Sequence, residues 1–68
     1  MYVVMNSEKI EAMRQERGFS RRELAERAGV APKTVARVER GLPVRRATGR
    51  SVANVFGLHP TEIGRPAR

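Results

Sequence analysis

The start of a helix is specified with particular strength at one point in this sequence, directly after Ser20. Ser20 and Glu23 have the spacing of a capping box, in which each side chain satisfies the backbone N–H of the other residue. Phe19 and Leu24 flank this box at the spacing of a hydrophobic staple, which sets the angle at which the chain enters the helix. Three local signals therefore agree on a helix that begins at Arg21.

This helix must be short, because a stop signal and a second start signal follow closely. Gly29 is the residue best able to adopt the left-handed conformation that ends a helix. Pro32 has a fixed φ that suits the first position of a new helix. We therefore predict two helices, over about 21–28 and 32–40, with only the segment 29–31 between them.

Apolar residues at helical spacing predict further helices on both sides of this pair. One is expected over 7–17, where an N-cap residue precedes it and Gly18 ends it. A fourth is expected over about 48–56, with Gly49 weakening its first turn, and a last short turn over 60–63. The residues expected to face the core are Ile10, Met13, Leu24, Ala25, Ala28, Val35, Val38, Val52, Ala53 and Phe56.

Length and composition fit one small helical domain. A chain of 68 residues has room for a single domain and buries only about 60% of its unfolded surface. It has no Cys and one histidine, His59, so we expect no disulfide, no metal site and no cofactor. We predict a compact all-α bundle of four to five short helices over 1–68, without a sheet of consequence and with a frayed tail at 64–68. The segment 2–5 either covers the base of the first helix or forms a strand between subunits.

The charge balance favours a polyanionic partner. Fourteen Lys and Arg residues stand against seven Asp and Glu, a formal net charge of +7. All of these cations except Lys9 and Lys33 are arginines, whose planar fork binds phosphate or a guanine edge in a bidentate manner. Nucleic acid is the favoured partner, and a solvated basic surface is the alternative. No apolar run approaches the roughly 20 residues of a membrane span, and the start of the chain lacks the apolar region of a signal peptide, so we expect a cytoplasmic, nucleoid-associated protein.

Two short helices joined by a tight turn at a glycine describe a helix-turn-helix, in which the second helix enters the major groove. An ordinary corner between two helices of a bundle is the alternative. The stretch 20–41 resembles the phage-repressor and Cro family, also called the XRE family, and the resemblance extends over about 10–63. Ala31 and Gly49 depart from the family pattern, which usually has a Ser or Thr cap and an apolar residue there. The residues that carry the resemblance are Leu24, Ala25, Gly29, Val30, Thr34, Val35, Val38, Glu39 and Gly41, with Phe56, Gly57 and Leu58 at the end of the fourth helix.

The resemblance implies roles for the cations around the helix-turn-helix. Lys33 and Arg37 are four residues apart and share one face of the helix, where both suit the O6 and N7 acceptors of guanine, so we expect half-sites that contain G. Pro32 and Ala36 offer apolar surface to a thymine methyl group. The base-reading residues are thus expected to be Arg21, Pro32, Lys33, Ala36 and Arg37. The phosphate contacts are assigned to Arg22, Thr34, Arg40, Arg45 and Arg46.

Two further sets of residues are expected to hold the domain and its assembly together. Arg14 and Glu39 match a structural ion pair of the family; the alternative is an exposed pair worth under about 1 kcal/mol. One helix-turn-helix reads only a few base pairs, so we expect a homodimer on a pseudo-palindromic operator. The candidate dimer contacts are Leu58, Pro60, Glu62 and Ile63; the alternative is that they belong to the core.

The predicted function is sequence-specific binding of double-stranded DNA by a small transcriptional regulator that acts as a repressor. The alternative is an antitoxin-type interaction module that binds a partner protein and represses its own operon. An enzyme is disfavoured because the sequence has no Cys, one His and no paired carboxylates with an evident pocket. No small-molecule ligand is evident, and RNA binding lacks an aromatic platform on a sheet.

Overall fold

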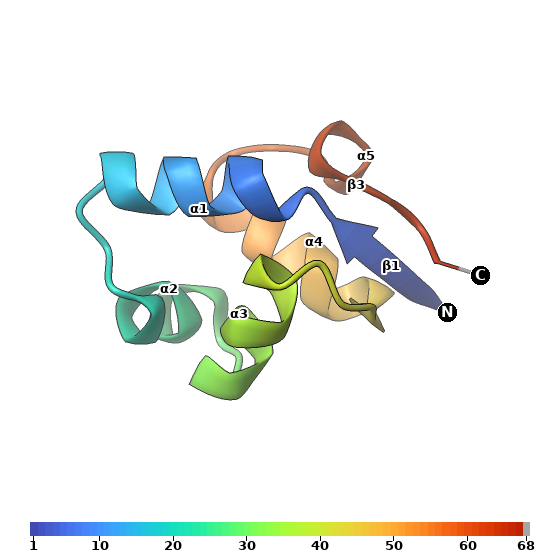
Figure 1. Ribbon diagram of the computed structural model, residues 1–68, viewed down its shortest axis with the longest axis horizontal. Helices are drawn as coiled ribbons and strands as arrows, with labels where there is room; N and C mark the ends of the chain where they lie inside the picture. The colour runs from blue at the N-terminus through green and yellow to red at the C-terminus, as the bar shows by residue number, and fades with distance from the viewer. Residues whose placement is uncertain (68) are drawn as a thin grey trace.

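The computed structural model describes residues 1–67, in which five helices and three short strands are present. The helices are α1 (Ser7–Glu16), α2 (Arg21–Ala28), α3 (Pro32–Glu39), α4 (Arg46–Val55) and α5 (Pro60–Ile63). The strands are β1 (Tyr2–Met5), β2 (Val44–Arg45) and β3 (Gly64–Pro66). The strands lie at the end of the molecule where both termini are found, and α2 lies at the opposite end (Figure 1).

The local signals of the sequence set both ends of α2 and the start of α3 as predicted. The hydroxyl of Ser20 accepts a hydrogen bond from the N–H of Glu23 at 3.0 Å, and the carboxylate of Glu23 accepts one from the N–H of Ser20 at 3.0 Å. Gly29 ends α2 in the left-handed conformation, with a φ of 72°. Ala31 gives α3 no side-chain cap, and Pro32 begins the helix at a position where no N–H is needed.

One apolar core joins the helices to the sheet. Its members on α1, α2, α3 and α4, and Phe56 directly after α4, were predicted from their spacing, while Met13 and Ala28, also predicted, pack at its edge. Three more residues, Met5, Val44 and Ile63, enter the core from the strands and α5. The buried core residues are Met5, Ile10, Leu24, Ala25, Val35, Val38, Val44, Val52, Ala53, Phe56 and Ile63.

The prediction of a domain without a sheet was wrong, so the all-α class is only approximate. β1 is the central strand of an antiparallel sheet with the order β2-β1-β3. The segment 64–66, expected to belong to a frayed tail, pairs with β1 as a strand. The segment 2–5 therefore pairs within its own chain. Strands of two to four residues carry too little alternation to be recognised in a sequence.

Gly49 allows this sheet to pack against α4. A Cβ atom at Gly49 would lie 2.8 Å from Cγ2 of Val3 and 3.0 Å from Sδ of Met5, so these two side chains would have to shift to make room for it. Gly49 therefore serves the contact between α4 and β1. The helix begins at Arg46, earlier than predicted, so Gly49 is its fourth residue.

Candidate nucleic-acid interface

The helix-turn-helix is formed by α2 and α3, which pack against each other and against the core. Leu24 and Ala25 of α2 and Val35 and Val38 of α3 are buried. In the turn, the N–H of Val30 donates to the carbonyl of Ala25 at 3.0 Å. Because its apolar residues are turned inward, α3 presents its polar residues on the outside of the molecule.

The exposed surface of α3 and of the segments that follow it carries charge of one sign. Between positions 27 and 61, Glu39 is the one acidic residue in the sequence, and its side chain is only 1% exposed. The other acidic residues lie on α1, α2 and α5. A surface with exposed cations and no exposed carboxylate attracts a polyanion. The exposed cations of this surface are Lys33, Arg37, Arg40, Arg45, Arg46 and Arg50.

Most of the residues expected to read bases are accessible on α3. Pro32, Lys33 and Arg37 are exposed, and Ala36 is half-buried. Arg37 also donates from Nη2 to the carbonyl of Pro43 at 2.8 Å. This hydrogen bond ties the middle of α3 to the connector before β2, and it leaves the other N–H groups of Arg37 available.

Arg21, the remaining expected base-reading residue, belongs to a cluster that joins three helices. Oε2 of Glu39 accepts from Nε of Arg14 at 2.7 Å, which is the contact expected for the structural ion pair. Oε1 of Glu39 accepts from Nη2 of Arg14 at 3.3 Å and from Nε of Arg21 at 3.0 Å. The side chain of Arg21 is 57% exposed, against 11% for Arg14. Glu39 therefore fixes the position of Nε of Arg21, while more than half of the Arg21 side chain remains exposed.

The residues expected to contact phosphates lie in two places. Arg22 is exposed on α2, beside Arg21. Arg40, Arg45 and Arg46 are exposed along the connector from the end of α3 to the start of α4, and Thr34 is half-buried on α3. The connector thus continues the cationic surface of α3 toward the sheet.

The expected dimer contacts do not all lie on the surface. Ile63 is 1% exposed and belongs to the core, so we remove it from the candidates. Its burial follows from α5, a single turn that packs on α4 with its apolar residue inward. Leu58 and Pro60 are half-buried, and exposed Glu62 accepts from the N–H of His59 at 2.8 Å in a capping box.

Several contacts of the cations were not predicted. The guanidinium of Arg27 lies 4.3 Å from the ring centroid of Phe19, and that of Arg17 lies 5.0 Å from that of Phe56. These contacts, like the one between Arg21 and Glu39, join residues too far apart in sequence for periodicity to reveal them. Within residues 1–67, no helix is long and apolar enough to cross a membrane.

Comparison with known proteins points to the same segment of the chain. A family model described as helix-turn-helix matches residues 10–63, from within α1 to the end of α5. No curated protein matches the sequence. The match includes the cluster around Glu39 and the whole of α3, and it leaves β1 and β3 outside.

Proposed function

Since this chain belongs to the phage-repressor and Cro-like helix-turn-helix family of DNA-binding transcription regulators, we propose that it is a repressor that reads an operator through the major groove with α3. The observation that carries this proposal is the exposed, acid-free surface of α3. Lys33 and Arg37 lie one turn apart on it and offer only hydrogen-bond donors. Donors in that arrangement suit the O6 and N7 acceptors of guanine, so G-containing half-sites are the proposed target.

The remaining cations divide by position into candidates for phosphate contacts and a candidate for a base contact. Arg40, Arg45 and Arg46 follow α3 along the connector, where they suit the phosphates that set the register of the protein on DNA. Arg21 and Arg22 lie at the start of α2, the helix that crosses the backbone in this motif. We assign Arg22 to a phosphate and keep Arg21 as a base-reading candidate whose direction is set by Glu39.

A homodimer on a pseudo-palindromic operator is part of the proposal, because one helix-turn-helix covers only a few base pairs. Leu58, Pro60 and Glu62 remain its candidate contacts. They lie at and after the end of α4, and the half-burial of Leu58 and Pro60 leaves apolar surface there for a second copy.

The test compares Arg37→Ala with Arg46→Ala on a duplex selected from a random pool by the full chain. Arg37→Ala should cost about 1–3 kcal/mol on the selected duplex and flatten the preference at one base pair, because a contact to a base edge is lost. Arg46→Ala should weaken all duplexes about equally and lower the salt slope by about one, as the loss of one phosphate contact does. Affinities are measured against single-base variants at several salt concentrations. If Arg37→Ala leaves the base preference unchanged, α3 is not the reading helix.

A further inference from the structure

The two faces of the sheet differ in what they contact. Val3 and Met5 point toward Gly49, so this face of the sheet packs on α4. Side chains alternate between the faces along a strand, which places Tyr2 and Val4 on the opposite face. In Figure 1, β1 lies in front of α4, and this opposite face is turned toward the viewer.

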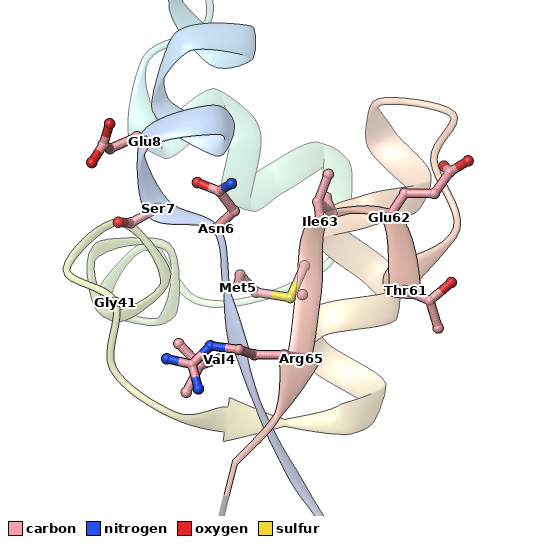
Figure 2. Close-up of a pocket in the computed structure, with 11 residues that line it drawn as sticks. Val4, Met5, Asn6, Ser7, Glu8, Gly41, Thr61, Glu62, Ile63 and Arg65 are labelled. Atoms are coloured by element: carbon pink, nitrogen blue, oxygen red, sulfur yellow. The ribbon is translucent and has the colours of Figure 1, made fainter.

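Two arginines from different strands share the face with Tyr2 and Val4. Residues paired directly across two strands lie on the same face. Arg45 of β2 is paired with Tyr2, and Arg65 of β3 is paired with Val4. Figure 2 shows the guanidinium of Arg65 across β1, beside Val4. We call the four residues Tyr2, Val4, Arg45 and Arg65 the outer sheet face.

Among residues 1–67, the polar groups of the outer sheet face have no acidic partner. Tyr2 is 49% exposed, and Arg45 and Arg65 are both exposed. Over residues 1–67, the salt bridges are those of Arg14 and Arg21 with Glu39. Glu8 and Glu62 line the same hollow as Val4 and Arg65, at its far side on α1 and α5, without forming a salt bridge to Arg65 (Figure 2). Two guanidinium groups and a phenol hydroxyl are therefore available to an anion.

The outer sheet face continues the cationic surface of the connector. β2 follows directly after Pro43, whose carbonyl accepts the hydrogen bond from Arg37 of α3. α3 packs against both β1 and β2, and the N–H of Arg46 donates to the carbonyl of Met1 at 3.0 Å. A duplex that lies along α3 and the connector therefore passes beside the sheet.

We propose that the outer sheet face extends the phosphate contacts of the connector, from Arg45 to Tyr2 and Arg65, to a part of the DNA backbone beyond the base pairs that α3 reads. This inference rests on the proposed function, because α3 places the duplex. Arginine and tyrosine side chains donate to phosphate oxygens, and such contacts add affinity without base preference. Duplex DNA is favoured over single-stranded RNA, because single-strand binding stacks successive bases on several aromatic side chains and this face has only Tyr2.

The test compares Arg65→Gln with Lys9→Gln, a matched loss of one exposed positive charge on α1. Both variants of the full chain are titrated with the selected duplex and with an unselected duplex of equal length, over a range of salt concentrations. Arg65→Gln should weaken both duplexes by the same factor and lower the salt slope by about 0.9, the value for one phosphate. Lys9→Gln should have the same salt slope as the unaltered chain. Arg65→Lys keeps the positive charge and should also have that slope. Shortening the duplex at its flanks should remove the difference between Arg65→Gln and the unaltered chain.

Several results would overturn the inference. One is a salt slope for Arg65→Gln equal to that for Lys9→Gln. Another is a loss of affinity in Arg65→Gln that is confined to single-stranded RNA. A changed oligomeric state of Arg65→Gln in sedimentation would assign the face to a contact between copies. Failure of the unaltered chain to bind any duplex would instead reject the proposed function. A base preference that depends on Arg37, together with an inert Arg65, would reject this inference alone.

Discussion

Removal of the Glu39 carboxylate should destabilise the domain far more than removal of an exposed carboxylate. The side chain of Glu39 is 1% exposed and accepts three hydrogen bonds from two guanidinium groups, at 2.7, 3.0 and 3.3 Å. The substitution Glu39→Ala leaves Arg14, whose side chain is 11% exposed, with a charge and no acidic partner. The same substitution releases Arg21, which at 57% exposure regains contact with water.

The expected magnitude follows from these exposures. Breaking a buried ion pair by removing one partner costs about 3–5 kcal/mol. Arg14 keeps its hydrogen bond to the carbonyl of Phe19, at 2.9 Å, and Arg21 is rehydrated, so the lower end of about 3 kcal/mol is expected. For a domain of this size, each kcal/mol lowers Tm by about 4–8 °C, which predicts a fall of about 12–24 °C.

Thermal unfolding followed by circular dichroism measures this loss, and double-mutant cycles divide it between the two arginines. Paired with Glu39→Ala, Arg14→Met should show the larger coupling, while Arg21→Met should show under about 1 kcal/mol, the value for an exposed pair. Glu26→Ala, an exposed charge on α2, is the control and should change stability by less than about 0.5 kcal/mol. A cost below about 1 kcal/mol for Glu39→Ala, or equal couplings for both arginines, would refute the buried character of this cluster.

Four further substitutions test the fold and the proposed dimer. Gly49→Ala should lower Tm, because overpacking against Val3 and Met5 costs about 1–3 kcal/mol. This cost outweighs the gain of up to about 1 kcal/mol in helix propensity. An unchanged or higher Tm would show that Val3 and Met5 move aside without loss of stability. Ser20→Ala should cost about 1 kcal/mol in a denaturant melt through loss of the cap of α2, and no change would mean that the cap contributes nothing. Ile63→Ala should lower the free energy of unfolding by about 2–5 kcal/mol without changing self-association. Leu58→Ala should lower it less and should weaken the proposed dimer. If sedimentation shows the opposite pattern, Ile63 belongs to the interface.

The helices could be predicted from the sequence because their signals are local. The capping box at Ser20, the left-handed Gly29 and Pro32 act on residues within one helical turn, and the structure places α2 and the start of α3 where these signals predict. The core faces of the helices followed from spacing for the same reason. The match of the family model then confirmed the resemblance that rested on those residues.

The sheet could not be predicted because its pairing is not local. β1 pairs with a segment about 40 residues later and with another about 60 residues later, and neither partner is long enough to show alternation. Pro66 lies on an edge strand, where its missing N–H is not needed. In the sequence, a proline at this position is equally compatible with an irregular tail. Ile63 was misplaced for the same reason, because only the packing of α5 on α4 shows which way it points.

For the candidate interface, the sequence provided a prediction of which cations belong to it, but no indication of the contacts that position their side chains. Lys33 and Arg37 were identified from their spacing on one helix and from the family resemblance. The hold of Glu39 on Arg21 spans 18 positions, and the bond from Arg37 to Pro43 depends on how the connector folds back. Neither contact has a sequence signal, because each depends on the tertiary arrangement of separate elements.

These contacts connect the sheet with α3, the proposed reading helix. The carbonyl that accepts from Arg37 belongs to Pro43, the residue directly before β2, and β2 is held by its pairing with β1. β1 in turn rests on α4 at Gly49, with no space for a Cβ atom. A displacement of the sheet therefore moves the partner of Arg37 as well as the outer sheet face. By this argument, Gly49→Ala should alter the base preference set by Arg37 even though Gly49 lies outside the cationic surface, whereas the exposed substitution Arg65→Gln should alter affinity alone.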